Sequence, residues 1–132
     1  MKIKEYTSDY QDQLFELFKT EGEEWGYWLP ENQANYVEAL EKSVTYIVVE
    51  NDQIIGFVRT LNDFVIWIVD LLVHKEHRGR AIGKQLMTYV CEQFPNKEVY
   101  VSGANDALPY YKKLGYEPEG VVYQVKAEGN NG

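Results

Sequence analysis

The sequence has little of what metal centres and disulfide frameworks require. It contains one cysteine, Cys91, and two histidines, so an internal disulfide and a multi-cysteine zinc site are excluded and no metal is expected. Lysine and arginine are also scarce, with 13 against 21 aspartates and glutamates, which gives a net charge of −8. That balance disfavours a nucleic-acid partner, because phosphate contacts need clustered basic side chains.

Long apolar runs are missing as well. The longest run, 64–69, has six residues and falls far short of the roughly 20 that span a bilayer, so no membrane partner is expected. The first residues, Met1 to Glu5, lack the apolar segment of a secretory signal. These absences predict a cytoplasmic protein.

The residues that are present suit a small folded domain. The chain has 132 residues, 45% of them hydrophobic, and its aromatics are 5 Phe, 3 Trp and 11 Tyr. This composition supplies one core and leaves no room for a second domain of ordinary size. We therefore predict a single domain over residues 1–126 and a flexible tail over residues 127–132.

Hydrophobic periodicity predicts an α+β domain built around one sheet. The predicted strands cover residues 2–6, 44–50, 53–60, 64–73, 98–101 and 121–126. The predicted helices cover residues 8–20, a segment from Pro30 onward, 80–94 and 107–114. His74 and His77 fall in a turn, where exposed loop histidines are the expected reading.

The most informative stretch runs from Asp70 to Lys84, where a strand ends, a turn of small residues follows and a helix begins. Such a turn leaves the first N–H groups of the helix free and directed at one spot, where the helix dipole also favours an anion. Arg78, Arg80 and Lys84 add positive charge to an otherwise acidic chain. The stretch predicts phosphate binding, although strand–turn–helix joints also use glycine for purely structural reasons.

Two segments resemble the GCN5-related N-acetyltransferase (GNAT) superfamily. The run from Arg78 to Gly83 resembles the family's acetyl-CoA motif, Arg/Gln-x-x-Gly-x-Gly/Ala. The run from Ala107 to Tyr116 resembles its Ala-x-x-Phe-Tyr-x-Lys-x-Gly-Phe segment. The resemblance implies a mixed central sheet with a splayed strand pair and helices on both faces. It also implies an enzyme that moves acetyl from acetyl-CoA to a primary amine by direct attack in a ternary complex.

The resemblance implies a set of cofactor-binding residues. The backbone of Leu71 and Val73 would bind the acetyl carbonyl and the pantetheine arm, and Asn105 lies one residue from a cofactor-contacting position of the family. Ala81 replaces the first motif glycine and places a methyl group beside the phosphate. The residues of the phosphate-binding turn are Arg78, Gly79, Arg80, Ala81, Ile82, Gly83 and Lys84.

The same resemblance assigns Tyr111 as the general acid toward the departing thiolate, a transfer that phenol and thiol pKa values permit. Position alone would make Tyr110 and Tyr111 core aromatics. Asp70 lies inside an apolar run, where a carboxylate needs a partner or a site. It is a second candidate catalytic residue, which binds the acceptor ammonium or relays its proton, and the alternative is a carboxylate paired with a neighbouring strand.

Acids and aromatics are mixed in the segment between the first two predicted helices. Glu24, Trp25, Tyr27 and Trp28 suit an organic cation, by charge and by cation–π contact. The alternative is that the acids are solvated and the rings close the core. We expect a small amine acceptor and pairing with a second copy, as is common in the family. A protein N-terminus or lysine as acceptor, and a non-catalytic acyl-CoA sensor, remain as alternatives.

Overall fold

The computed structural model describes residues 2–127, apart from the side chain of Asn105. These residues form two compact units, the first ending at Val101 and the second beginning at Ser102. Residues 128–132, most of the predicted tail, lie outside the described part. A single domain over residues 1–126 therefore stays a prediction.

The first unit is organised around one five-stranded sheet in the order β1-β2-β3-β4-β5. Neighbours from β1 to β4 are antiparallel, and β4 and β5 are parallel. This arrangement confirms the predicted mixed sheet. The strands are β1 (Lys2–Glu5), β2 (Val44–Glu50), β3 (Gln53–Asn62), β4 (Ile66–Val73) and β5 (Val99–Val101).

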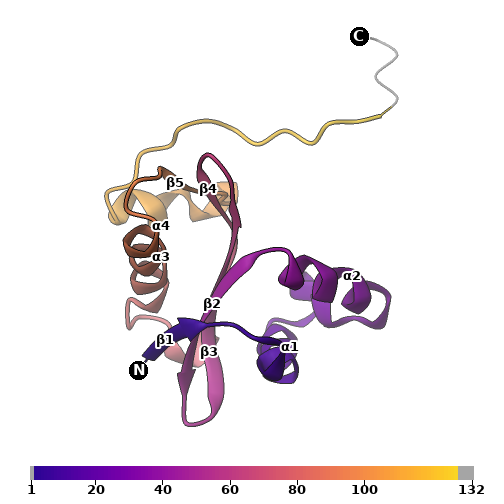
Figure 1. Ribbon diagram of the computed structural model, residues 1–132. Coiled ribbons are helices and arrows are strands. Elements are labelled where there is room, and N and C mark those ends of the chain that lie inside the picture. The colour runs from indigo at the N-terminus through magenta and orange to yellow at the C-terminus, as the bar shows by residue number, and fades with distance from the viewer. Residues whose placement is uncertain (1, 128–132) are drawn as a thin grey trace. The chain divides into compact units, whose positions relative to one another are not determined.

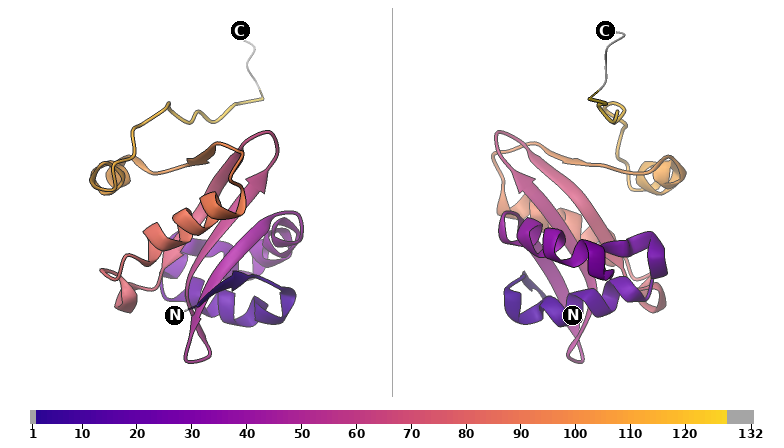
Figure 2. Two further views of the ribbon diagram at one scale, coloured as in Figure 1. Left: turned by 60° about the vertical axis from the view of Figure 1, so that its left-hand side comes forward. Right: turned by 90° about the vertical axis from the view of Figure 1, so that its right-hand side faces the viewer.

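Helices cover both faces of this sheet, as expected. Figures 1 and 2 show α1 and α2 on one face and α3 on the opposite face. The helices of this unit are α1 (Gln11–Lys19), α2 (Pro30–Glu41) and α3 (Ile82–Gln93), with short 3-10 turns η1 (Ser8–Tyr10), η2 (Gly22–Trp28) and η3 (Lys75–His77). The second unit holds η4 (Asn105–Ala107) and α4 (Leu108–Lys113).

Alternation along the strands gives each face its own core. On the α1 side, Phe18 is fully buried and its ring contacts Trp25, Tyr36 and Phe57 at centroid distances of 5.7, 5.5 and 5.1 Å. On the other side, α3 buries its apolar stripe, which consists of Ile82, Leu86, Met87 and Val90. Each such side chain stabilises the fold by about 1.5–3 kcal/mol, so both helix layers hold the sheet firmly in place.

The last predicted strand is wrong. Residues 121–126 have the composition of a strand, but they form none, and Val121, Tyr123 and Val125 are 74%, 81% and 92% exposed. Strand propensity reflects packing against a neighbour, and this segment pairs with no strand among residues 2–127.

The prediction of two exposed histidines is wrong for His74, which is buried. Its Nδ1 accepts a hydrogen bond from the backbone N–H of Glu76 at 3.1 Å. The imidazole therefore caps the N-terminus of η3 and is not exposed to water. In residues 2–127, no group of three or more potential metal ligands comes together. None of the helices in this part of the chain combines the length and the apolarity that a membrane crossing requires.

Candidate functional site

The two parallel strands at the edge of the sheet separate after three residue pairs. β5 pairs only with Ile66–Ile68 of β4. β4 itself continues to Val73, and its other edge stays paired with β3 as far as the Val73–Gly56 pair. Within residues 2–127, the stretch from Val69 to Val73 therefore has no strand on its β5 side. The resemblance implied this splay, and it leaves backbone groups along Val69–Val73 without a strand partner, although the Val73 carbonyl accepts from Arg78 Nε.

The turn after β4 uses two left-handed residues. After η3, Gly79 has a φ of +88° and Ala81 has a φ of +60°. Ala81 stands at the N-cap, so α3 begins at Ile82 rather than at Arg80 as the periodicity suggested. The left-handed conformation raises the free energy of an alanine by roughly 1–2 kcal/mol. Ala81, which replaces the first motif glycine, is thus held in a backbone conformation that glycine favours.

The first turn of α3 is open to an anion. No side chain caps it, and the Ala81 carbonyl at its N-cap accepts from the Gln85 N–H at 3.0 Å. The N–H groups of Ile82, Gly83 and Lys84 thus lack intrahelical acceptors. These donors and the helix dipole would favour an anion at this turn, and anion binding here stays a prediction.

Both motif arginines are held by carboxylates that the sequence analysis did not single out in this role. Arg78 pairs with Glu21 at 3.0 Å, and its Nε donates to the Val73 carbonyl at 3.0 Å. Arg80 makes two bonds to Glu50, at 3.0 and 2.9 Å, and these bonds lower the pKa of Glu50. The turn is thus tied to the rest of the unit at both arginines.

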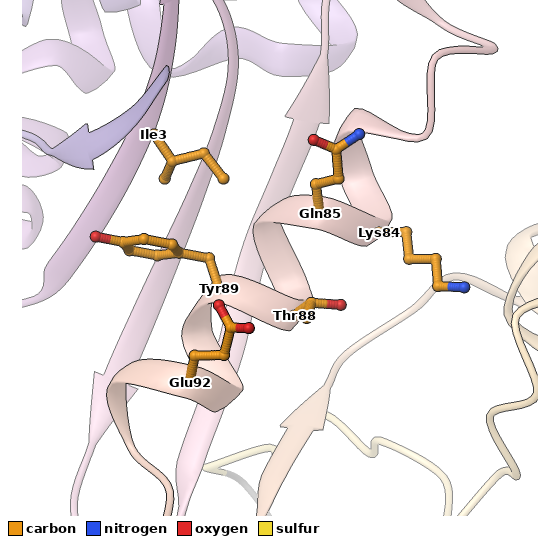
Figure 3. A pocket seen from close by; sticks show the side chains of 6 residues that line it. All are labelled: Ile3, Lys84, Gln85, Thr88, Tyr89 and Glu92. Carbon is orange, nitrogen blue, oxygen red and sulfur yellow. The ribbon is translucent and has the colours of Figure 1, made fainter. Parts of the chain in front are cut away.

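The third motif cation lies on the outer face of α3. Figure 3 shows a groove between β1 and α3, with the Lys84 ammonium directed away from Ile3 and Tyr89. No ion pair of Lys84 occurs within the described residues. The groove is lined by Ile3, Lys84, Gln85, Thr88, Tyr89 and Glu92.

Asp70 is a buried carboxylate with three donors. Its Oδ2 accepts from Arg59 Nε at 2.7 Å and from the Tyr36 hydroxyl at 2.8 Å, and its Oδ1 accepts from the Tyr27 hydroxyl at 3.3 Å. Burial and the nearby Asp70 charge raise the pKa of both tyrosines, so both stay neutral donors. Of the two readings for Asp70, the structure supplies the paired carboxylate, and it also places that carboxylate beneath two tyrosine hydroxyls.

Those two tyrosines reach the surface at a small cavity. Their rings stack with centroids 4.2 Å apart. The cavity has a volume of about 280 Å³, and its lining residues are Tyr27, Tyr36, Asn32 and Asn35. Sequence reasoning missed Arg59 and Tyr36. The signal for Arg59 was available, since a lone arginine in an apolar strand is the natural partner of a lone aspartate in the next strand.

The aromatic segment η2 divides its residues between packing and the cavity. Trp25 stacks on Phe18, and the indole N–H of Trp28 donates to the Gly22 carbonyl at 3.1 Å. Tyr27 alone of the four predicted residues lines the cavity, while Glu24 is exposed. The structure therefore brings Tyr27 to Asp70 and uses the two tryptophans to close the core.

The second unit carries the other predicted catalytic residue. Tyr111 lies in α4, and its ring stacks on that of Tyr116 with centroids 6.3 Å apart. A Cβ at Gly103 would stand 2.6 Å from Cε2 of Tyr111, so this ring position requires glycine there. Burial, with smaller effects of Tyr110 and Tyr116, raises the pKa of Tyr111. The backbone of Asn105 is in η4, and its side chain lies outside the described part.

Comparisons with known proteins agree on the family. A family model described as the acetyltransferase (GNAT) domain matches residues 41–118. An uncharacterized N-acetyltransferase of Pyropia yezoensis, ycf52, is 30% identical over 78 residues, which cover 54% of this chain. The match covers 45% of that relative, so the chain corresponds to less than half of its length.

Solved structures share the fold at low sequence identity. A GNAT-family acetyltransferase of Streptococcus pneumoniae superposes with a TM-score of 0.73 at 21% identity, covering 96% of this chain and 98% of that one. An aminoglycoside N-acetyltransferase solved in complex with CoA superposes with a TM-score of 0.72 at 19% identity. The match covers 96% of this chain and 94% of that one. With the splayed strands, the open α3 terminus and the matched domain all in place, this chain belongs to the GNAT acetyltransferase family.

Proposed function

We propose that the protein is an acetyl-CoA-dependent N-acetyltransferase that acts on the primary amine of a small cationic acceptor. One observation carries this proposal. The uncapped N-terminus of α3 follows directly after the strand that loses its β5 neighbour, within a chain of the GNAT family. An anion site beside unpaired strand backbone suits a ligand with a pyrophosphate and an amide-containing arm.

The residues around α3 fit the cofactor. Acetyl-CoA would supply the activated acetyl thioester when it is bound. The N–H groups from Ile82 to Lys84 would hold its pyrophosphate, and the backbone of Leu71 and Val73 would bind its arm. Arg78 and Arg80 would exchange a carboxylate for a phosphate, which charge-assisted bonding permits. A neighbour with the same fold was solved with CoA, which supports this assignment.

The acceptor is placed at the cavity of Tyr27 and Tyr36. Both hydroxyls donate to Asp70, so the oxygen of the half-buried Tyr27 keeps lone pairs that would accept from an amine. The exposed carboxylate of Glu24 and the net charge of −8 favour a cation in the vicinity. In this proposal Trp25 and Trp28 support the wall of the site rather than touch the acceptor.

Asp70 acts through its tyrosines. Direct proton abstraction would require one of its three hydrogen bonds to break, so we assign it the orientation and polarisation of the Tyr27 hydroxyl. The ammonium first loses a proton to water, and the neutral amine then attacks the acetyl carbonyl directly, because neither motif offers an activated nucleophile. The C–N bond forms as the C–S bond breaks, and the second proton on nitrogen leaves to water. Tyr111 is proposed as the acid that protonates the thiolate, since its raised pKa keeps the proton in place at neutral pH.

Thiol release from acetyl-CoA tests this function against polyamines, aminosugars, amino acids and basic peptides. Cys91 is exposed and would react with a thiol reagent, so the assay uses Cys91→Ser with protein-only blanks. Turnover with polyamines or aminosugars is the expected result. Turnover with peptides alone would move the function to protein acetylation. A thermal shift with acetyl-CoA but no turnover would favour a sensor, and no shift would contradict the cofactor assignment.

A further inference from the structure

The side chain of Arg80 is held by a carboxylate and by an imidazole. Its Nη1 and Nη2 donate to the two carboxylate oxygens of Glu50 at 3.0 and 2.9 Å. The same Nη1 lies 2.8 Å from Nδ1 of His77. Because a guanidinium nitrogen can only donate, Nδ1 of His77 must be an unprotonated acceptor. The arrangement therefore requires a neutral His77.

A proton on Nδ1 of His77 would reverse this contact. An imidazolium donates from both ring nitrogens, so two donors and two positive charges would face each other at hydrogen-bond distance. An acceptor for the new N–H is already near, since Oε2 of Glu50 lies 3.7 Å from Nδ1. The Nη1 of Arg80 donates to that same oxygen, so the imidazolium and the guanidinium would compete for it.

The surroundings of His77 leave its ring as the group that changes charge. Besides Arg80, the charged and titratable groups around it are Glu50 at the end of β2 and His74, Lys75 and Glu76 of its own segment. The bonds from Arg80 lower the pKa of Glu50, so this carboxylate stays ionised. His74 is buried, and its Nδ1 already accepts from the backbone of η3. The other two side chains are exposed.

We propose that His77 is a pH-sensitive switch for cofactor binding: the protonated ring donates to the Glu50 carboxylate and releases Arg80 to the phosphates of acetyl-CoA. This regulation rests on the proposed function, because it needs the turn of residues 78–84 to bind those phosphates. Histidine ordinarily changes its charge between about pH 5 and 8. Acidification within that range therefore strengthens cofactor binding.

Two effects act in this same direction. The released guanidinium exchanges a carboxylate for a phosphate, and the imidazolium adds a positive charge beside the turn. Linkage makes the effect reciprocal, so a ligand that binds the protonated form more tightly must itself favour protonation of His77. Cofactor binding near neutral pH should accordingly take up protons.

Isothermal titration calorimetry at pH 8 and pH 6, at constant ionic strength, tests the switch. The ligand is dephospho-CoA, which keeps the pyrophosphate but lacks the 3′-phosphate, a group that itself gains a proton in this range. We expect the wild type to bind it about fivefold more tightly at pH 6. His77→Gln keeps a neutral acceptor and should bind equally at both pH values. His77→Lys carries a permanent charge and should bind tightly at both.

Proton uptake by the unmodified protein gives a second readout. Titrations at pH 7 in two buffers with different protonation enthalpies should show uptake of a fraction of a proton in the wild type and none in His77→Gln. Equal or weaker wild-type binding at pH 6, or equal uptake in both proteins, would overturn the switch and leave the cofactor assignment intact. If dephospho-CoA fails to bind at either pH, the cofactor assignment and the switch are both overturned.

Discussion

Arg59 and Asp70 face each other across β3 and β4 and form an ion pair of 2.7 Å between Nε and Oδ2, with 14% and 7% of their side chains exposed. The pair lies next to a β-bulge between Arg59 and Thr60, two residues beyond the last β4 residue that pairs with β5. Burial alone would lower the pKa of Arg59, but its bonds to Asp70 raise it. The two charges therefore stabilise one another at the position where the sheet opens.

Asp70→Asn should lower the free energy of unfolding by roughly 3–5 kcal/mol, because it leaves the Arg59 guanidinium without its carboxylate partner in a nearly buried position. Urea denaturation measures the loss. The double variant Arg59→Met/Asp70→Asn should lose less than the sum of the two single variants, since it removes both charges together. Strictly additive losses would show that the pair is not coupled.

Tyr27→Phe should raise the KM for the acceptor about tenfold and leave the KM for acetyl-CoA unchanged, because it removes from a cavity-lining residue the hydroxyl that Asp70 orients and that is proposed to bind the amine. Steady-state kinetics with both substrates varied provide the measurement. Tyr89→Phe, in the groove on α3, is the matched control. An equal effect of the two variants would remove Tyr27 from the acceptor site.

Tyr111→Phe should reduce kcat about 100-fold with little change in either KM, as expected for the loss of a general acid. Tyr110→Phe, on the same helix, should stay near wild type. Because the pKa of Tyr111 is raised, wild-type kcat should lose this acid only above about pH 10. A Tyr111→Phe variant with full turnover would exclude the assignment.

Ala81→Gly should raise the free energy of unfolding by about 0.5–1 kcal/mol, since relief of left-handed strain exceeds the added flexibility of glycine. It should also tighten acetyl-CoA binding by removing the methyl group beside the first turn of α3. Thermal unfolding and isothermal titration calorimetry measure the two effects. Weaker binding in the glycine variant would mean that Ala81 organises the turn.

Tyr36→Phe should reduce the loss of stability at alkaline pH. Burial and Asp70 raise the pKa of Tyr36 in the folded chain, so above about pH 10 the unfolded chain binds fewer protons than the folded one. Stability then falls as pH rises, and without the hydroxyl this contribution is absent. Urea unfolding at pH 7 and pH 10.5 gives the difference. Identical pH dependence in the two proteins would contradict it.

Much of the fold followed from local patterns. Val44–Glu50 was predicted to its exact ends, because a β-branched run before the Asn51–Asp52 turn describes a hairpin strand fully. The start of α3 was displaced by the left-handed Ala81, which periodicity does not reveal. The prediction of a strand at 121–126 failed because a strand forms only beside a partner strand, and the sequence of a segment does not show whether such a partner is present.

The site was predictable where a motif carries it and not where distant residues complete it. The turn proposed to bind phosphate was located from glycines and basic residues in one stretch. The partners of that turn, Glu21 and Glu50, come from other elements, and only folding brings them to Arg78 and Arg80. Likewise, Asp70 was identified by its apolar surroundings, but its three donors could not be counted from the sequence.

The bond between Glu50 and Arg80 makes the length of a distant hairpin matter to the phosphate-binding turn. Glu50 is the last residue of β2, directly before the two left-handed residues that close the β2–β3 hairpin, and it reaches an arginine 30 positions later. An insertion that shifts the register of β2 against β3 would carry the carboxylate out of reach and release the arginine. Hairpin length and the side chain at position 80 should therefore change together whenever this scaffold is redesigned.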